Sequence, residues 1–131
     1  MSSYEPGSAH DALERIRAGT GPWVAIGDLV DDWHRTDIAG RERMIEEPLG
    51  LADDEAERRW AAFIAAAVDQ LCWESRPRIA PPVWVIDETY VLAEPWFLLP
   101  GWRLRMHQLV DTPAAFKRRN IYGGDRIISR V

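Results

Sequence analysis

Two pairs of residues have the types and spacing that acid–base or metal chemistry needs. His107 and Asp111 are four residues apart, so on a helix the carboxylate can orient the imidazole, which is half of a general-base arrangement. Asp31 and His34 are three apart and could share a metal ion, but a third ligand would have to come from elsewhere. No nucleophile motif accompanies either pair. We therefore predict structural contacts here, with no catalytic residue and no metal ligand.

Two further features have simpler structural interpretations. Cys72 follows Leu71 in an apolar segment, where a thiol is most often a small buried hydrophobe. Gly19-Thr20-Gly21 lacks the third glycine and the lysine of a phosphate-binding loop, so it predicts a plain turn. The sequence therefore predicts no cofactor. An enzyme that uses His34 or His107 with nearby carboxylates is the weakest of the functional hypotheses.

Among the sequence features, the charge distribution gives the most support to a binding function. Residues 103–131, the basic tail, hold six Arg and one Lys against two Asp, a net charge of +5. Residues 1–102, the acidic body, hold 9 Arg against 19 acidic residues, a net charge of -10. Two interpretations stay open, because the basic tail can fold over the acidic body or can bind an acidic partner.

The leading hypothesis is a protein-binding or regulatory protein that uses the basic tail. The residues predicted to contact the partner are cations of this tail and the aromatic and amide side chains beside them: Arg103, Arg105, Phe116, Lys117, Arg118, Arg119 and Asn120. The alternative is a nucleic-acid-binding protein, because an aromatic followed by three consecutive cations is compatible with phosphate contacts. The sequence does not define the oligomeric state.

The elements that position these residues are predicted to be mostly helices. Helical spacing and capping signals indicate four helices before residue 77, over 8–17, 22–35, 38–47 and 53–74. Ser8 and Asp11 form a capping-box pattern at the first of these. The fourth is the longest and is predicted to be the central core helix. Three tryptophans, Trp23, Trp33 and Trp60, fall on apolar faces and are predicted to be core residues.

The rest of the chain is predicted to wrap this core. Residues 77–101 contain five of the nine prolines, so they cannot form a long regular element. Their composition favours a short β-hairpin between 83–86 and 90–92, with Trp96 as an anchor on the core. The next segment places Trp102, Met106, Leu109 and Val110 on one helical face, although Trp102, Leu104 and Met106 also alternate with polar residues as in a strand; its length slightly favours the helix. A short basic helix over 114–120 should follow, capped by the Thr112 hydroxyl.

The fold class predicted is therefore a small, mostly α, single-domain helical bundle with a Pro/Trp-rich wrapping segment. A chain of 131 residues has the usual size of one domain, and only residues 1–7 are predicted to be disordered. The single cysteine fits a reducing cytoplasm. No secretory signal and no stretch of 18 apolar residues is present, so we expect a cytoplasmic protein without a membrane interaction.

The C-terminal part also carries a resemblance. Pro95-Trp96-Phe97 followed by Thr112-Pro113-Ala114-Ala115-Phe116-Lys117-Arg118-Arg119-Asn120-Ile121 resembles a group of small uncharacterised bacterial proteins with Pro-Trp-Phe and Ser/Thr-Pro-x-x-Phe-x-x-Arg-Asn-Ile elements. The similarity covers roughly residues 25–131, and the chain departs from the pattern at 98–101 and at Gly123-Gly124. Because such proteins are often encoded beside toxin and antitoxin genes, the resemblance implies an antitoxin-like or accessory role. It carries over no functional residue.

Overall fold

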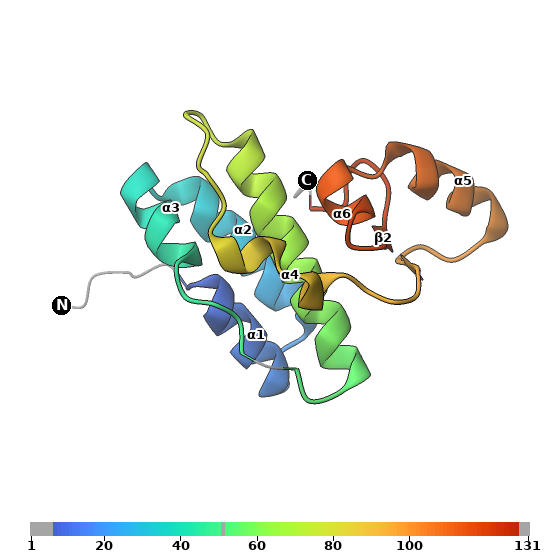
Figure 1. Ribbon diagram of the computed structural model, residues 1–131, viewed down its shortest axis with the longest axis horizontal. Coiled ribbons are helices and arrows are strands. Elements are labelled where there is room, and N and C mark those ends of the chain that lie inside the picture. The colour runs from blue at the N-terminus through green and yellow to red at the C-terminus, as the bar shows by residue number, and fades with distance from the viewer. Residues whose placement is uncertain (1–6, 51, 129–131) are drawn as a thin grey trace.

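The structure is mostly helical, as predicted. The computed structural model describes residues 7–50 and 52–128, and of Trp102 and Arg103 it describes the backbone alone. The elements in chain order are α1 (Ala9–Arg17), α2 (Pro22–Arg35), α3 (Ile38–Ile45), α4 (Glu55–Glu74), the 3-10 helices η1 (Val83–Ile86) and η2 (Glu88–Tyr90), strand β1 (Trp96–Phe97), α5 (Trp102–Asp111), α6 (Ala114–Lys117) and strand β2 (Ile121–Tyr122). Figure 1 shows α1 and α5 on opposite sides of α4.

Side-chain caps set the starts of three helices. The Ser8 hydroxyl accepts a hydrogen bond from the Asp11 N–H at 3.0 Å, and the Asp11 carboxylate accepts one from the Ser8 N–H at 3.3 Å. The carboxylates of Asp37 and Asp54 accept from amides three residues further on, each at 2.8 Å. These acceptors matter because the first N–H groups of a helix have no partner within it. The four predicted N-terminal helices are confirmed, with ends that differ by at most two residues.

The predicted disorder of residues 1–7 concerns mainly residues that lie outside the described ranges, namely 1–6. Gly7 is described, and its backbone N–H donates to the Asp32 carboxylate at 3.2 Å. Gly7 is therefore held against α2.

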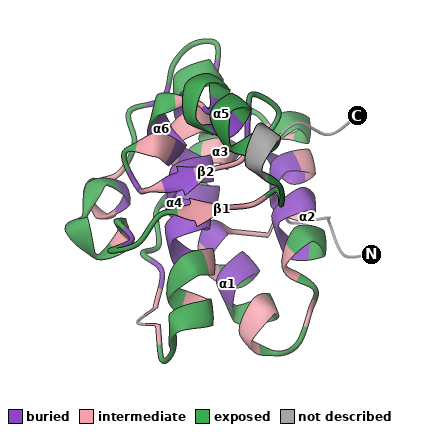
Figure 2. Cartoon of the chain, turned by 90° about the vertical axis from the view of Figure 1, so that its right-hand side faces the viewer, coloured by how far each residue is buried: buried purple, intermediate pink, exposed green. Residues whose placement is uncertain are grey.

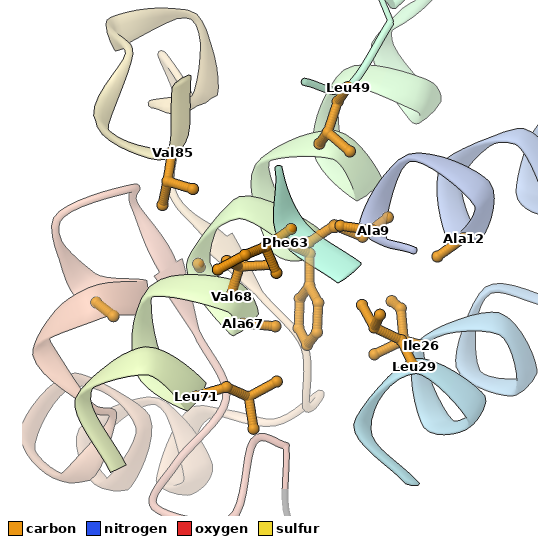
Figure 3. Packing of buried hydrophobic residues seen from close by; sticks show 14 of the residues in the cluster. Ala9, Ala12, Ile26, Leu29, Leu49, Phe63, Ala67, Val68, Leu71 and Val85 are labelled. Carbon is orange, nitrogen blue, oxygen red and sulfur yellow. The ribbon is translucent and has the colours of Figure 1, made fainter. Parts of the chain in front are cut away.

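Helix α4 is the centre of the fold, which confirms that prediction. Its residues 61–68 are buried without a break, whereas a surface helix buries one face only. Helix α1 packs against it, and so do α6, η1 and η2. Figure 3 shows Phe63 of α4 directed toward Ile26 and Leu29 of α2. The many alanines of α4 allow this close approach from several sides.

An aromatic cluster joins α4 to the wrapping segment and to α6. The ring of Trp60 lies 5.0 Å from Trp96, and Phe63 lies 5.1 Å from Phe116, both in edge-to-face geometry. Trp96 therefore anchors the wrapping segment, as predicted. Trp33 is fully buried, also as predicted. The prediction that Trp23 is a core residue is wrong, because this ring contacts Trp60 and Phe63 in edge-to-face geometry but stays half exposed.

The predicted β-hairpin is wrong. Residues 83–86 and 88–90 form the 3-10 helices η1 and η2, in which the Asp87 carboxylate accepts from the Thr89 N–H at 2.9 Å and turns the chain. The indole N–H of Trp84 donates to the Ile45 carbonyl at 2.8 Å. The segment is thus hydrogen-bonded to the end of α3, whereas the strands of a hairpin would bond to each other. The sheet of the described chain is a parallel pair, in which Trp96 faces Ile121 across β1 and β2.

The wrapping segment pairs with the basic tail by backbone hydrogen bonds. The N–H of Leu92 donates to the Arg119 carbonyl at 3.1 Å, and the N–H of Trp96 donates to the Asn120 carbonyl at 2.9 Å. This pairing continues from Leu98 to Tyr122 at 2.9 Å. The Pro/Trp-rich segment is thus a strap that crosses α4 and ends beside the tail (Figure 1).

The tail itself contains two helices of different lengths. Helix α5 is confirmed, while α6 ends at Lys117 instead of Asn120. The reason is that Asn120 adopts a left-handed conformation, with φ of 67°, before the chain enters β2. Asparagine tolerates this conformation better than most residues.

Replacing Trp96 by Ala is expected to lower the free energy of unfolding by about 3 kcal/mol, because the change removes a large ring from the aromatic cluster. Urea denaturation followed by circular dichroism measures this loss. Trp73→Ala is the matched control, since Trp73 is more than half exposed and its loss should cost less than about 1 kcal/mol. Equal losses in the two variants would contradict the anchoring role of Trp96.

Candidate functional site

Arg119, which the sequence places in the partner-binding set, is a buried structural residue. Its side chain is 3% exposed. One guanidinium nitrogen donates to Asp69 of α4 at 3.0 Å and to the Ala115 carbonyl at 2.6 Å, and the other donates to the Val85 carbonyl of η1 at 2.8 Å. Arg119 therefore joins α4, η1 and α6, and it offers no surface to a partner.

The charge of Arg119 is balanced inside the protein. Burial lowers the pKa of the guanidinium, and the hydrogen bond and charge of Asp69 act in the opposite direction. An arginine pKa lies so far above neutral pH that the group stays charged. The buried charge is tolerated because it has a carboxylate and two carbonyls as acceptors.

Phe116 and Asn120 are also structural. Phe116 is fully buried against Phe63 of α4. The Asn120 amide donates to the Leu92 carbonyl at 3.1 Å, and its oxygen accepts from the Tyr122 hydroxyl at 3.2 Å. Both residues therefore fasten the tail to the core and the strap.

The remaining predicted residues lie at the surface, apart from Arg103, whose side chain lies outside the described residues. Arg118 is 60% exposed and reaches Asp69 at 3.5 Å. Lys117 donates to the carbonyl of Val110 at 2.8 Å. The Arg105 guanidinium lies over the Phe97 ring, 5.1 Å from its centroid. Arg118 and Arg119 both pair with one acid of α4, so at this point the basic tail does fold over the acidic body.

Helix α5 turns a polar residue inward and apolar residues outward. Gln108 is fully buried, and its side chain forms one hydrogen bond with the N–H of Leu99 and another with the carbonyl of the same residue, at 3.0 and 3.1 Å. The residues that we call the outer face of α5 are Met106, Leu109 and Val110, which are 61%, 42% and 64% exposed. Figure 2 shows α5 as mainly exposed. The predicted helical face is therefore present, but it faces solvent.

His107 holds α5 to the end of the described chain. Its Nδ1 lies 2.6 Å from Asp111, and its Nε2 lies 3.6 Å from Asp125. The predicted contact with Asp111 is thus confirmed. Because each ring nitrogen faces a carboxylate, the arrangement does not leave a nitrogen aimed at a substrate proton. Gly124 has a φ of 85°, which favours glycine, and a Cβ there would lie 2.8 Å from Nε2, so a larger residue would also displace the His107 ring.

Thr112 completes this attachment, in a role that differs from the predicted one. Its hydroxyl donates to the Gln108 carbonyl and accepts from the N–H groups of Gly123 and Gly124, at 3.1 and 2.9 Å. The prediction that this hydroxyl caps the next helix is wrong, because α6 has no side-chain cap. Thr112 instead binds the end of α5 to the loop after β2.

The other candidate residues do not assemble into a reactive centre. Asp31 and His34 lie on α2, and within residues 7–50 and 52–128 no group of three or more His, Cys, Asp or Glu side chains is arranged to hold a metal ion. Cys72 is buried, as predicted. Burial, with a smaller contribution from the charge of Asp69, raises the pKa of its thiol to about 12. The thiol is therefore protonated, and not a nucleophile, at neutral pH.

Sequence reasoning missed two surface features. The outer face of α5 has the spacing of a buried face, and the signal against burial is Gln108, a polar residue at the position that faces inward. The second feature is Trp73, an exposed ring at the end of α4 with the Arg78 guanidinium 3.6 Å from its centroid. Arg78 lies five residues after Trp73, beyond the end of α4, and this spacing gave no sign of the stacking.

Comparisons with known proteins do not add to this geometry. No family model matches the chain, and neither the curated proteins nor the solved structures give a match. In the described part of the chain, no helix combines the length and the apolar character needed to cross a bilayer.

Replacing Arg119 by Ala is expected to lower the free energy of unfolding by about 3–5 kcal/mol, because Asp69 and two carbonyls lose their buried donor. Arg118→Ala is the matched control, with an expected cost under about 1 kcal/mol for a largely exposed ion pair. Urea denaturation of both variants makes the comparison. A loss in Arg118→Ala as large as that in Arg119→Ala would refute the structural role assigned to Arg119.

Cys72 is expected to resist alkylation by iodoacetamide at pH 8, because a thiol with a pKa of about 12 is almost entirely protonated there and is also buried. In urea the same thiol should react at the rate of an ordinary cysteine. Mass spectrometry of timed samples measures both rates. Rapid labelling of the folded protein would contradict the burial of Cys72.

Proposed function

We propose that this chain is a protein-binding module and that the outer face of α5 packs into an apolar groove of its partner. The observation that carries this proposal is the exposure of three large apolar side chains on one helical face. Contiguous apolar patches on a soluble protein mark interaction sites more often than chance. Full burial of an exposed valine, leucine or methionine side chain contributes about 1.5–3 kcal/mol, and covering the part of these three side chains that is still exposed would contribute a share of that to binding.

The surroundings of this face indicate the chemistry of the partner. Arg105 lies on the same helix, and Lys117 reaches the carbonyl of Val110 at its end. An apolar groove with an acidic rim fits this combination, because the cations would steer and orient the encounter. In this proposal the basic tail has the binding role that the sequence predicts, and the apolar side chains of α5 are the main contact.

The attachment of α5 also supports binding. Gln108, His107 and Thr112 hold the helix through hydrogen bonds and ion pairs that do not use its outer face. A helix that is already ordered loses less conformational entropy on binding than a disordered segment would. Recognition by a preformed helix in a groove is a common mode of protein association.

The first partner to test is the product of a neighbouring gene. This choice rests on the resemblance to small bacterial proteins that are often encoded beside toxin and antitoxin genes, and it makes an antitoxin-like or accessory role in the cytoplasm the working hypothesis. Nucleic-acid binding has less support, since Arg119 is buried and α6 is a single turn. An enzymatic role has less support as well, because carboxylates face both nitrogens of His107.

The test is a double variant, Met106→Lys with Val110→Lys. Both positions are mostly exposed, so the fold should survive while the partner loses its apolar contacts. Co-purification from the cells that make the protein, followed by quantitative mass spectrometry, should show at least a roughly tenfold loss of a specific partner, which corresponds to 1.4 kcal/mol.

Val83→Lys is the matched control, because Val83 is an apolar residue 84% exposed on η1. This variant should retain the partner, and all variants should unfold at the temperature of the wild type. The proposal would be overturned if the double variant retained every protein that the wild type captures, or if the two variants lost the same proteins equally.

A further inference from the structure

A hollow of about 420 Å³ lies between α4 and α6, which pack side by side (Figure 1). This volume falls within the usual range of small-molecule sites, about 300–1,000 Å³. The residues that line the hollow on the α6 side are Pro113, Ala114, Ala115 and Arg118, and Gln70 and Trp73 line it on the α4 side. Its wall thus combines apolar residues of α6 with the Arg118 guanidinium, the Trp73 indole, the Gln70 amide and the Asp69 carboxylate, and of these the guanidinium is the group that attracts an anion.

The charges at this hollow are not balanced. Asp69, which also lines it, presents one carboxylate oxygen to two guanidinium groups, at 3.0 Å from Arg119 and 3.5 Å from Arg118. Arg119 makes the shorter contact and is buried. Arg118 therefore makes only a long ion pair with a carboxylate that Arg119 already binds, and most of the Arg118 side chain is exposed. Its planar guanidinium can donate two parallel hydrogen bonds to a second carboxylate.

Trp73 gives the hollow a flat aromatic wall. The guanidinium of Arg78 lies 3.6 Å from the indole centroid, so it covers one face of the ring and leaves the other for a ligand. A planar apolar ligand can pack against such a ring, because offset and edge-to-face aromatic contacts contribute about 0.5–1.5 kcal/mol beyond area burial. Cation and indole together select for a molecule that is both flat and anionic.

We propose that this hollow binds a small aromatic carboxylate, with the carboxylate on Arg118 and the ring against Trp73. This site goes beyond the protein-binding function and uses none of the outer face of α5. Arg118 would exchange its long contact with Asp69 for a direct pair with the ligand, while Arg119 keeps Asp69 satisfied in the bound state.

The experiment is isothermal titration of the full chain with 2-naphthoate and with its neutral counterpart 2-naphthamide. The acid should bind with a dissociation constant on the order of 0.1–1 mM, as expected for a ligand of this size in a partly open site. The amide should bind at least about tenfold more weakly, because it lacks the charge that Arg118 recognises. Arg118→Gln and Trp73→Ala should each weaken the acid by about tenfold.

Arg126→Gln is the matched control, since Arg126 is an exposed arginine of the same tail that does not line the hollow. This variant should bind 2-naphthoate as the wild type does. The site is overturned if 2-naphthoate fails to bind at about 5 mM, where a millimolar site would be mostly filled. It is also overturned if the amide binds equally well, if Arg118→Gln has no effect, or if an acidic peptide without an aromatic group competes as strongly as the acid.

Discussion

The buried ion pair of Arg119 and Asp69 is the constraint on which the rest of the structure depends. A guanidinium inside a protein costs several kcal/mol unless all of its donors find acceptors, and these acceptors come from α4, η1 and α6. The carbonyl of Arg119 also accepts from Leu92 of the strap. Strap and tail can therefore dock on α4 only in the arrangement that completes this network, and the burial of Phe116 and the pairing of β1 with β2 follow from it.

The same network explains why α5 lies apart from the core. Phe116 and Ile121 of the tail are both fully buried, whereas the helix that precedes them buries no apolar side chain among its residues 104–111. It is held instead by polar groups, of which Gln108 is the most buried. The apolar side chains of α5 are consequently turned outward, and the hollow at Trp73 remains open on the side of α6 that α5 does not reach.

The sequence predicts the helices well because their signals are local. Ser8 and Asp11 form a capping box within one turn, which indicates the start of α1. The length and apolar content of its segment indicate α4. The strap could not be predicted, since its conformation depends on distant acceptors such as the Ile45 carbonyl that binds Trp84. For the same reason, Arg118 and Arg119 are adjacent in the sequence and indistinguishable there, although one is exposed and the other is buried against Asp69, 50 residues away.

The separation of roles within α5 has a consequence for how this protein can evolve. Met106 and Val110 take no part through their side chains in the hydrogen bonds and ion pairs that fix the tail, which rest on Gln108, His107 and Thr112. Mutations at the outward positions are therefore nearly neutral for folding. Natural selection can change the shape and polarity of this face one residue at a time, while the inward positions and Gly124 stay fixed.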